Sequence, residues 1–272
     1  MHEISPVKRR SLGSSQLTIL CALLLVLVGC DKLKSPNLSG SSPSRPARHQ
    51  VSHSPRLAII IDDLGSDESA VDEIFALPYP LTLSVLPNHP HSTEIALEAH
   101  RRGYQVMLHL PMESEANEAA EAQELRPGMP SAEVSRMLGE MLRNVPYAAG
   151  VNNHQGSLAT SDPRLMAELM PLLRARNLFF IDSRTIAATV AYDIAERDGV
   201  HSAFRNVPFL DDIQSESAIH HQMEIAIHGA KEKGEAIVIG HPHPETLRVL
   251  REFLPQMKSQ GVELVHASAL VR

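Results

Sequence analysis

Residues 57–61 form an apolar run that is followed at once by two aspartates, and this stretch constrains the fold more than any other. Its three consecutive isoleucines are typical of a strand buried on both faces, as in a parallel sheet. Asp62 and Asp63 then bring two like charges together at the end of the strand, and Gly65 lets the backbone turn away. Because desolvation adds to their repulsion, such a pair indicates a bound cation or a carboxylate that serves as a base. The alternative is a simple strand end, since residues 66–68 open a helical pattern.

The first 29 residues have the pattern of a targeting segment. A basic cluster at 8–10 precedes an apolar run at 17–28 that is short for a transmembrane helix. Cys30 follows this run in a pattern that resembles the bacterial lipobox, in which the cysteine is acylated, and Asp31 resembles a signal for retention at the inner membrane. We therefore expect a lipoprotein on the periplasmic side of a bacterial cell envelope, held to the membrane through Cys30. The alternative is an ordinary membrane anchor with a chance cysteine.

Residues 30–55 are rich in serine, proline and arginine without apolar periodicity, which predicts a flexible tether. The other cysteine, Cys21, lies in the apolar run, so the chain after residue 29 has no pair of thiols for a disulfide or a zinc–thiolate site. That part carries 22 basic and 31 acidic side chains, a net charge of −9, which argues against a nucleic-acid partner.

From Arg56 onward, short apolar runs alternate with helical patterns. This alternation predicts an α/β domain over 56–272, with parallel strands joined by helical crossovers in either a distorted barrel or an open doubly wound sheet. The predicted strands are 57–61, 81–86, 104–109, 148–152, 178–182, 203–207, 236–240 and 262–266. The predicted helices are 67–76, 92–102, 131–143, 162–176, 187–198, 215–232 and 245–259.

Polar residues follow five of these strands, and the carboxyl ends of parallel strands meet on one side of a sheet or barrel. They are Asp62 and Asp63, His109 and Glu113, Asn152, Asn153 and His154, Asp182 and Arg184, and His241 and His243. A single histidine at a strand end is more often a solvated loop residue. Carboxylates and imidazoles gathered from several strands, however, suit Zn²⁺, or another divalent ion such as Mn²⁺ or Ni²⁺. The pattern therefore indicates a metal hydrolase.

The motifs occur in a fixed order along the chain. They are Ile-Asp-Asp-Leu-Gly at 61–65, His-Leu-Pro-Met-Glu at 109–113, Asn-Asn-His-Gln-Gly-Ser at 152–157, Ile-Asp-Ser-Arg at 181–184 and Gly-His-Pro-His-Pro at 240–244. This order resembles the divergent polysaccharide deacetylase family, distant relatives of the NodB-type carbohydrate esterases. The resemblance spans residues 56–270 and implies a distorted (β/α) barrel of seven or eight units.

The resemblance also implies roles for the acidic and histidine residues. In NodB-type enzymes the first aspartate of the first motif is the base and the second is a metal ligand, which correspond to Asp62 and Asp63. The second motif there, His-x-x-x-His, supplies two more ligands. The matching positions here are His109 and Glu113, so that glutamate replaces the second histidine. His154 is the competing third ligand.

The late motif of those enzymes contains a histidine that acts as general acid. His241 matches it, His243 is the fallback, and Asp182 could orient the His241 ring. Asp211 and Asp212 are expected to lie in a loop ahead of the next helix, although strand six also ends at the active side.

The third motif of NodB-type enzymes has no clear match, and Asn152 and Asn153 occupy its place. We expect these two residues, with Arg184 and His243, to bind substrate.

These expectations combine into a metal-dependent deacetylase that acts on N- or O-acetylated carbohydrate of the envelope, such as peptidoglycan. The alternative is a catalytically inactive barrel that binds glycan or an envelope protein. Glu113 in a ligand position, the unmatched third motif, and an aromatic content of 4% without tryptophan favour that alternative.

Overall fold

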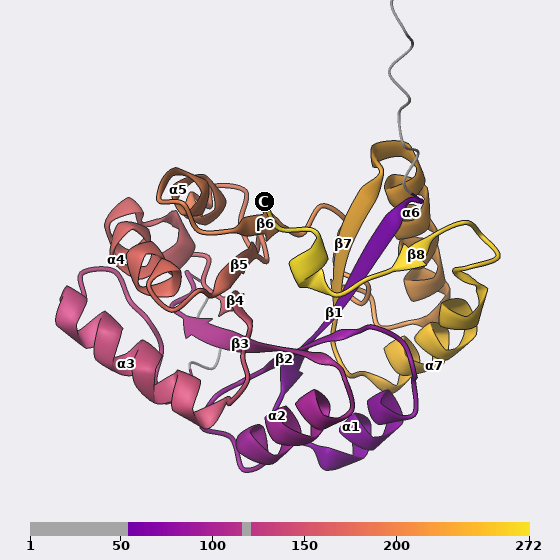
Figure 1. Cartoon of the computed structure of the whole chain (residues 1–272), viewed down its shortest axis with the longest axis horizontal. Helices are drawn as coiled ribbons and strands as arrows, with labels where there is room; N and C mark the ends of the chain where they lie inside the picture. Colours follow the sequence, from indigo (N-terminus) through magenta and orange to yellow (C-terminus); the bar gives the residue numbers. More distant parts are fainter. Residues whose placement is uncertain (1–53, 116–120) are drawn as a thin grey trace, which may run out of the picture. The chain divides into compact units, whose positions relative to one another are not determined.

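Parallel strands form a curved sheet at the centre of the part of the chain that the computed structural model describes, residues 54–115 and 121–272 (Figure 1). Neighbouring strands follow the order β6-β5-β4-β3-β2-β1-β7, and the short strand β8 also pairs with β1. The strands are β1 (Arg56–Leu64), β2 (Thr82–Val85), β3 (Gln105–Met112), β4 (Gly150–Gln155), β5 (Phe179–Asp182), β6 (Ser202–Phe204), β7 (Glu235–Gly240) and β8 (Glu263–Leu264).

This strand order confirms the predicted distorted (β/α) barrel and excludes the doubly wound sheet. A doubly wound sheet reverses its strand order at a switch point, whereas here successive strands lie side by side around one curve. The sheet is left open between β6 and β7. The backbone N–H groups of Asn206 and Leu210 donate to the carbonyls of Ile237 and Ile239 at 3.3 and 2.9 Å, so the chain after β6 bridges this opening.

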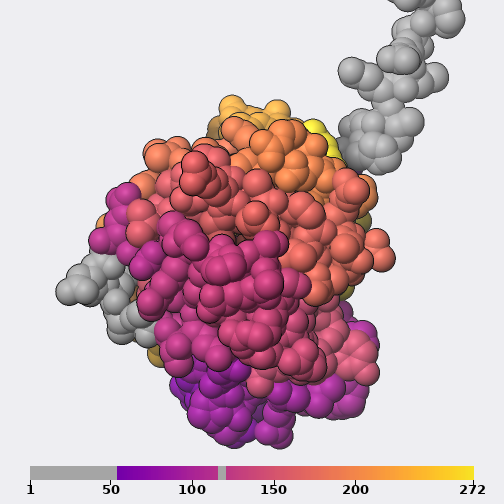
Figure 2. All heavy atoms as spheres, turned by 90° about the vertical axis from the view of Figure 1, so that its left-hand side faces the viewer, coloured from indigo at the N-terminus to yellow at the C-terminus, as the bar shows by residue number. Residues whose placement is uncertain are grey.

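Helices cover the outside of the curved sheet (Figure 1). On the side that Figure 2 shows, side chains of α3 and α4 cover the strands. The α-helices are α1 (Glu68–Phe75), α2 (Ser92–Arg101), α3 (Ser131–Asn144), α4 (Pro163–Arg174), α5 (Ala191–Arg197), α6 (Glu216–Lys233) and α7 (Pro244–Phe253). Short 3₁₀ turns are η1 (Ala159–Ser161), η2 (Leu254–Gln256) and η3 (Ala267–Ala269).

Most element boundaries lie within a few residues of the predicted ones, with two informative differences. The seventh helix ends at Phe253 rather than at 259, and a 3₁₀ turn that contains Pro255 follows it; proline has no N–H to continue the helical ladder. The first strand does not end at 61 but continues to Leu64, so the aspartate pair lies inside β1 rather than after it.

The strand residues alternate between apolar clusters on the two faces of the sheet. On β1, Leu57, Ile59 and Ile61 belong to the cluster between sheet and helices, whereas Ala58 and Ile60 belong to the cluster inside the barrel. The same alternation holds on β3, β5 and β7, and the interior cluster includes Ala267 and Leu270 from the C-terminal segment. Apolar side chains therefore fill the lower part of the barrel, and the acidic and histidine residues gather at the carboxyl end of the strands.

The predicted signal segment 1–29, the acylated Cys30 with Asp31, and residues 31–53 of the predicted tether lie outside the described residues. The described residues fall within a compact unit at 51–272. Among the helices of residues 54–115 and 121–272, none has the length and apolar character that a membrane span needs.

Replacing Leu110 with alanine tests the packing between β3 and the helices. Leu110 is fully buried in the outer cluster, so we expect Leu110→Ala to lower the free energy of unfolding by about 2–5 kcal/mol in urea titrations. Leu97→Ala on α2 is the control, because that side chain is 46% exposed and its loss should change the free energy by less than about 1 kcal/mol. Equal effects of the two substitutions would contradict this packing.

Candidate metal centre and catalytic site

An irregularity in β1 turns Asp63 toward the inside of the barrel. Ile61 pairs with Leu83 and Leu64 with Val85, so β1 carries one extra residue between these pairs, which is a β-bulge. By alternation Asp62 continues the inward series of Ala58 and Ile60, and Asp63 would point outward. Asp63 instead has a φ of 60°, in the left-handed region that few residues other than glycine adopt. The bulge thus lets two consecutive carboxylates face one cavity.

Asp63, His109 and His154 bring three potential ligand atoms together at the carboxyl ends of β1, β3 and β4. Asp63 Oδ1 lies 3.1 Å from His109 Nε2 and 3.0 Å from His154 Nδ1, and the two nitrogens are 3.2 Å apart. Ligands of a tetrahedral zinc ion are roughly 3.3 Å from one another. These three atoms form a triangle, called the ligand triangle below, whose sides have the lengths that a small divalent ion requires.

The Asp63 carboxylate provides an independent test of this fit. Its Oδ1 atom is buried and makes no hydrogen bond within the described part of the chain. Two imidazole nitrogens lie close to it, but neither approach has hydrogen-bond geometry. Burial by itself would raise the pKa of Asp63, yet His109 and His154 hold it well below its usual range. An ionised oxygen without a hydrogen-bond partner, on which two ring nitrogens converge, fits a shared cation.

Of the two candidates for the third ligand, the described residues place His154, and not Glu113, in this group. The reason is the length of β3, which continues to Met112. Residues four apart on an extended strand are separated by about 13 Å, too far to share one ion with His109. His154 stands on the neighbouring strand, paired with Pro111, and so reaches the same point from the side.

Asp62 lies beneath the metal group and is 2% exposed. Both of its carboxylate oxygens accept hydrogen bonds from Asn152 Nδ2, at 2.9 and 3.0 Å, and Oδ2 is 3.6 Å from His109 Nε2. Burial raises the pKa of Asp62, although the charges of His109 and His241 act against it. A carboxylate with a raised pKa is suited to accept a proton.

His241 stands at the end of β7, on the other side of Asp63. Its Nε2 is 3.8 Å from Asp63 Oδ2, and its Nδ1 is 2.8 Å from Asp211 Oδ1. Burial would lower the pKa of His241, but the hydrogen bond and charge of Asp211, with the charges of Asp62 and Asp63, raise it to about 9. His241 is therefore protonated at neutral pH and can donate a proton from Nε2.

Asp211, and not Asp182, orients the His241 ring, which corrects the sequence prediction. On β5, Asp182 lies two residues after Phe180, which faces the helices, so Asp182 points to the same outer side of the sheet. Its carboxylate accepts hydrogen bonds from Thr189 and from the backbone of Arg184 and Tyr192. Burial raises the pKa of Asp182.

Asp211 was expected to be a loop residue and is 4% exposed. It accepts from the His241 backbone N–H and from Thr246 Oγ1, both at 2.7 Å, in addition to the His241 ring. The chain after β6 brings it there by bridging the open side of the barrel.

The residues expected to bind substrate occupy different surroundings. Asn152 is fully buried with its polar atoms bonded inside the protein, so the expectation that it contacts substrate is wrong. Asn153 is 1% exposed and bonds to the backbone of Ser183 and Gln155. Arg184 is exposed and stacks on the ring of Phe204, and His243 lies 3.0 Å from Gln214 Nε2. Asn153 nevertheless lines the cavity, and a substrate contact of Asn153, Arg184 or His243 stays a prediction.

The metal group opens into a cavity of about 550 Å³. Most of the residues that line it have polar side chains, and Phe209 is the apolar one among them. The lining residues are Asp62, Asp63, His109, Ser114, Asn153, His154, Gln155, Ser157, Ser183, Thr185, Phe209, Asp212 and His241. One face of the Phe209 ring is covered by the guanidinium of Arg205, 3.9 Å from its centroid.

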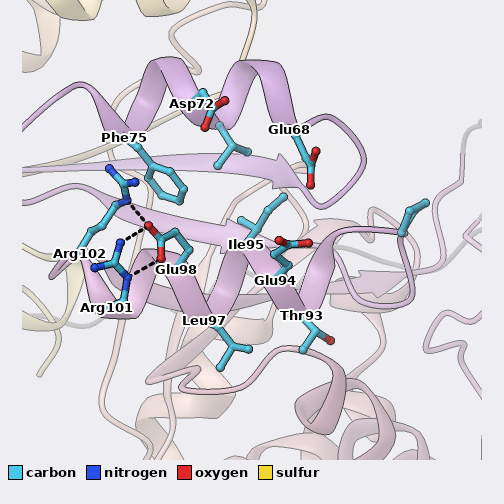
Figure 3. Close-up of a pocket in the computed structure, with 12 residues that line it drawn as sticks. Glu68, Asp72, Phe75, Thr93, Glu94, Ile95, Leu97, Glu98, Arg101 and Arg102 are labelled. Carbon is cyan, nitrogen blue, oxygen red and sulfur yellow. Dashed lines mark hydrogen bonds and ion pairs between the residues drawn. The ribbon is translucent and has the colours of Figure 1, made fainter.

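A hollow of about 660 Å³ lies outside the barrel, between α1 and α2 (Figure 3). Its apolar floor includes Val71, Phe75 and Ile95, and Glu98 beside it is paired with Arg101 and Arg102. Among the described residues, none lines both this hollow and the strand-end cavity. A nearby group at its rim, Glu68 with His91 and Glu94, consists of exposed or half-exposed side chains.

Residues 59–271 match the family model of the divergent polysaccharide deacetylases. YibQ, an uncharacterized protein of Escherichia coli strain K12, is 42% identical over 216 residues, which cover 79% of this chain and 67% of that protein.

Solved structures share the fold. An uncharacterized protein from Agrobacterium tumefaciens C58 has a TM-score of 0.76 at 22% identity, covering 81% of this chain and 91% of that one. A CE4 family pseudoenzyme from Bacillus anthracis has a TM-score of 0.54 at 12% identity, covering 80% and 66%. The catalytic domain of a peptidoglycan N-acetylglucosamine deacetylase from Eubacterium rectale ATCC 33656 has a TM-score of 0.52 at 14% identity, covering 86% and 96%. The barrel of this chain is therefore NodB-like.

The ligand assignment can be tested by metal titration of the purified chain. We expect Asp63→Ala, His109→Ala and His154→Ala each to weaken Zn²⁺ binding by at least about 100-fold, because each removes a ligand of a three-ligand site. Glu113→Gln is the matched control and should bind Zn²⁺ like the unmodified chain. Loss of binding in Glu113→Gln together with retention in His154→Ala would identify Glu113, rather than His154, as the third ligand.

The ion pair of His241 and Asp211 predicts a pH dependence. In Asp211→Asn we expect the pKa of His241 to fall from about 9 toward the value of about 6.5 of a free histidine, as followed by NMR titration of the ring. A raised histidine pKa stabilises the folded state fully below the unfolded value and loses that effect as the pH rises through about 9. The pKa of Asp211 is lowered, so its own contribution is lost as the pH falls toward the acid range.

Asp211→Asn should therefore lower the urea midpoint most between about pH 5 and 6 and much less near pH 10. A His241 pKa that stays near 9 in the variant would show that Asp62 and Asp63, rather than Asp211, hold the proton.

Proposed function

Because the chain belongs to the divergent polysaccharide deacetylase family, we propose that it is a metal-dependent hydrolase that removes acetyl groups from N- or O-acetylated carbohydrate of the bacterial cell envelope. One observation carries the proposal. The three-ligand group of Asp63, His109 and His154 lies in one cavity between a buried carboxylate, Asp62, and a protonated imidazole, His241. A proton acceptor and a proton donor on either side of a metal group are the parts that hydrolysis of an acetyl group needs.

Asp63, His109 and His154 would hold the ion, and their mixed oxygen and nitrogen donors suit Zn²⁺ first, then Mn²⁺ or Ni²⁺. When bound, such an ion polarises the acetyl carbonyl and lowers the pKa of water. Asp62 accepts the proton that the attacking water loses. As the bond between the acetyl carbon and the sugar nitrogen breaks, His241 Nε2 donates a proton to that nitrogen, and acetate and a free amine result. For an O-acetyl group the leaving atom is an oxygen.

The carbohydrate part of the proposal draws support from the cavity and from the comparisons. The wall offers hydroxyl and amide groups from Ser157, Gln155 and Thr185, with Phe209 as the aromatic surface beside His241. The Eubacterium rectale neighbour acts on peptidoglycan. Anchoring through Cys30, with the tether that follows, would bring the barrel within reach of this polymer from the periplasmic side of the inner membrane, and forms part of the same proposal.

The inactive binding barrel is the weaker alternative. One of its arguments was Glu113 in a ligand position, and the place of His154 beside Asp63 and His109 weakens that argument. The unmatched third motif and the low aromatic content still favour it. The likeness to a CE4 pseudoenzyme keeps the alternative as an outcome of the experiment.

Release of acetate from N-acetylglucosamine oligomers and from peptidoglycan fragments, with Zn²⁺ supplied, tests the function. We expect Asp62→Asn and His241→Ala to lower kcat by at least about 100-fold while both variants still bind Zn²⁺, because each removes a proton transfer and leaves the ligands in place. His228→Ala is the control, since the side chain of that α6 histidine is 72% exposed. Zinc binding without acetate release from N- or O-acetylated glycans would favour the binding barrel.

A further inference from the structure

We propose that Asn152 is a positioning residue that orients the metal ligand His109 and the base Asp62 through the two ends of one side-chain amide. The inference rests on the proposed function for the role of Asp62. The contact with His109 can be tested separately from activity. The sequence predicted that Asn152 binds substrate. Asn152 is completely buried in the described structure, which rules out that contact.

The Asn152 amide uses its full hydrogen-bonding capacity. Its Nδ2 donates to both oxygens of Asp62, at 2.9 and 3.0 Å, and lies 3.2 Å from Ser183 Oγ. Its Oδ1 lies 2.9 Å from His109 Nδ1 and accepts from Ser84 Oγ at 2.5 Å. An amide has two N–H donors and two oxygen lone pairs, so four partners satisfy it completely.

The partners also fix which end of the amide is which. The Asp62 carboxylate can only accept while it is ionised, so the NH₂ group must face it. A flipped amide would set its oxygen against the carboxylate and its NH₂ against His109. The oxygen therefore faces the His109 ring, and the ring nitrogen at that contact, Nδ1, must carry the proton.

This proton position has a direct consequence for the metal group. A neutral histidine protonated at Nδ1 presents a lone pair at Nε2, and Nε2 is the atom that lies 3.1 Å from Asp63 Oδ1 in the ligand triangle. The same amide holds the carboxylate of Asp62, whose Oδ2 is 3.6 Å from that Nε2. One side chain thus sets the tautomer of a ligand and the direction of the base.

Substitutions at position 152 separate the two contacts. In Asn152→Asp an oxygen still accepts from His109, but a second carboxylate replaces the donor that faces Asp62. In Asn152→Leu, which has nearly the same shape, both contacts are lost. Asn177→Asp is the matched control for added charge, because Asn177 is exposed in the turn before β5 and its φ of 55° is one that aspartate tolerates.

Three measurements on the purified chain test the proposal, after circular dichroism has shown that each variant folds. NMR of histidines labelled with ¹⁵N reports the tautomer of His109 in the metal-free protein, at a pH high enough for the ring to be neutral. Burial would lower the pKa of His109, but Asp62, Asp63 and the Asn152 hydrogen bond raise it. Titration with Zn²⁺ reports affinity, and acetate release reports kcat. We expect the Nδ1–H tautomer in the unmodified chain and its loss in Asn152→Leu, with Zn²⁺ affinity about 10–100-fold lower in that variant.

Asn152→Asp should retain the tautomer and bind Zn²⁺ as tightly as the unmodified chain, but lower kcat by about 100-fold or more. Asn177→Asp should match the unmodified chain in all three measurements. An Nε2–H tautomer of His109 in the unmodified chain would overturn the proposal, and this test requires no variant. Unchanged tautomer and affinity in Asn152→Leu, or full activity in Asn152→Asp, would also overturn it. If the unmodified chain binds Zn²⁺ without releasing acetate, the deacetylase function fails, while tautomer and affinity still decide the role of Asn152 toward His109.

Discussion

The left-handed backbone at Asp63 is the constraint on which the site depends. A regular strand sends consecutive side chains to opposite faces, so Asp62 and Asp63 could not both reach one cavity. The bulge in β1 and the φ of 60° at Asp63 remove that restriction. Such a conformation is unfavourable for a residue with a Cβ, and paired strands on both sides of β1 hold it in place. The strained backbone at Asp63 is therefore the free-energy cost of placing the ligand Asp63 and the base Asp62 at one cavity.

The alternation of side chains explains which site residues the sequence could identify. His109 follows the inward phase of Met107, and His241 follows that of Ile237 and Ile239, so each must face the cavity at the end of its strand. Asp182 stands in the outward phase of Phe180, and the same rule would have removed it from the site. The order of strands and helices was equally readable, because each parallel crossover has a distinct apolar pattern.

The remaining parts depend on distances that no local pattern encodes. Whether Glu113 or His154 lies beside Asp63 and His109 depends on the length of β3, and a sequence motif of fixed spacing gives no measure of that length. Asp211 reaches His241 because the chain after β6 crosses the open side of the barrel. Ring closure of a barrel is a global property. Consequently, the partner of the general acid was misassigned although the acid itself was found.

Two adjacent aspartates of one strand differ in their chemistry because their neighbours differ. Asp63 faces two imidazoles, and their attraction exceeds the effect of burial, so its pKa is lowered and it stays ionised as a ligand should. Asp62 lies deeper, where burial dominates, and its pKa is raised. Like charges this close would destabilise the fold if both were left uncompensated. Their different pKa values therefore suit Asp63 to be the ligand and Asp62 to be the base. In other active sites, too, different surroundings give paired carboxylates different pKa values and different roles.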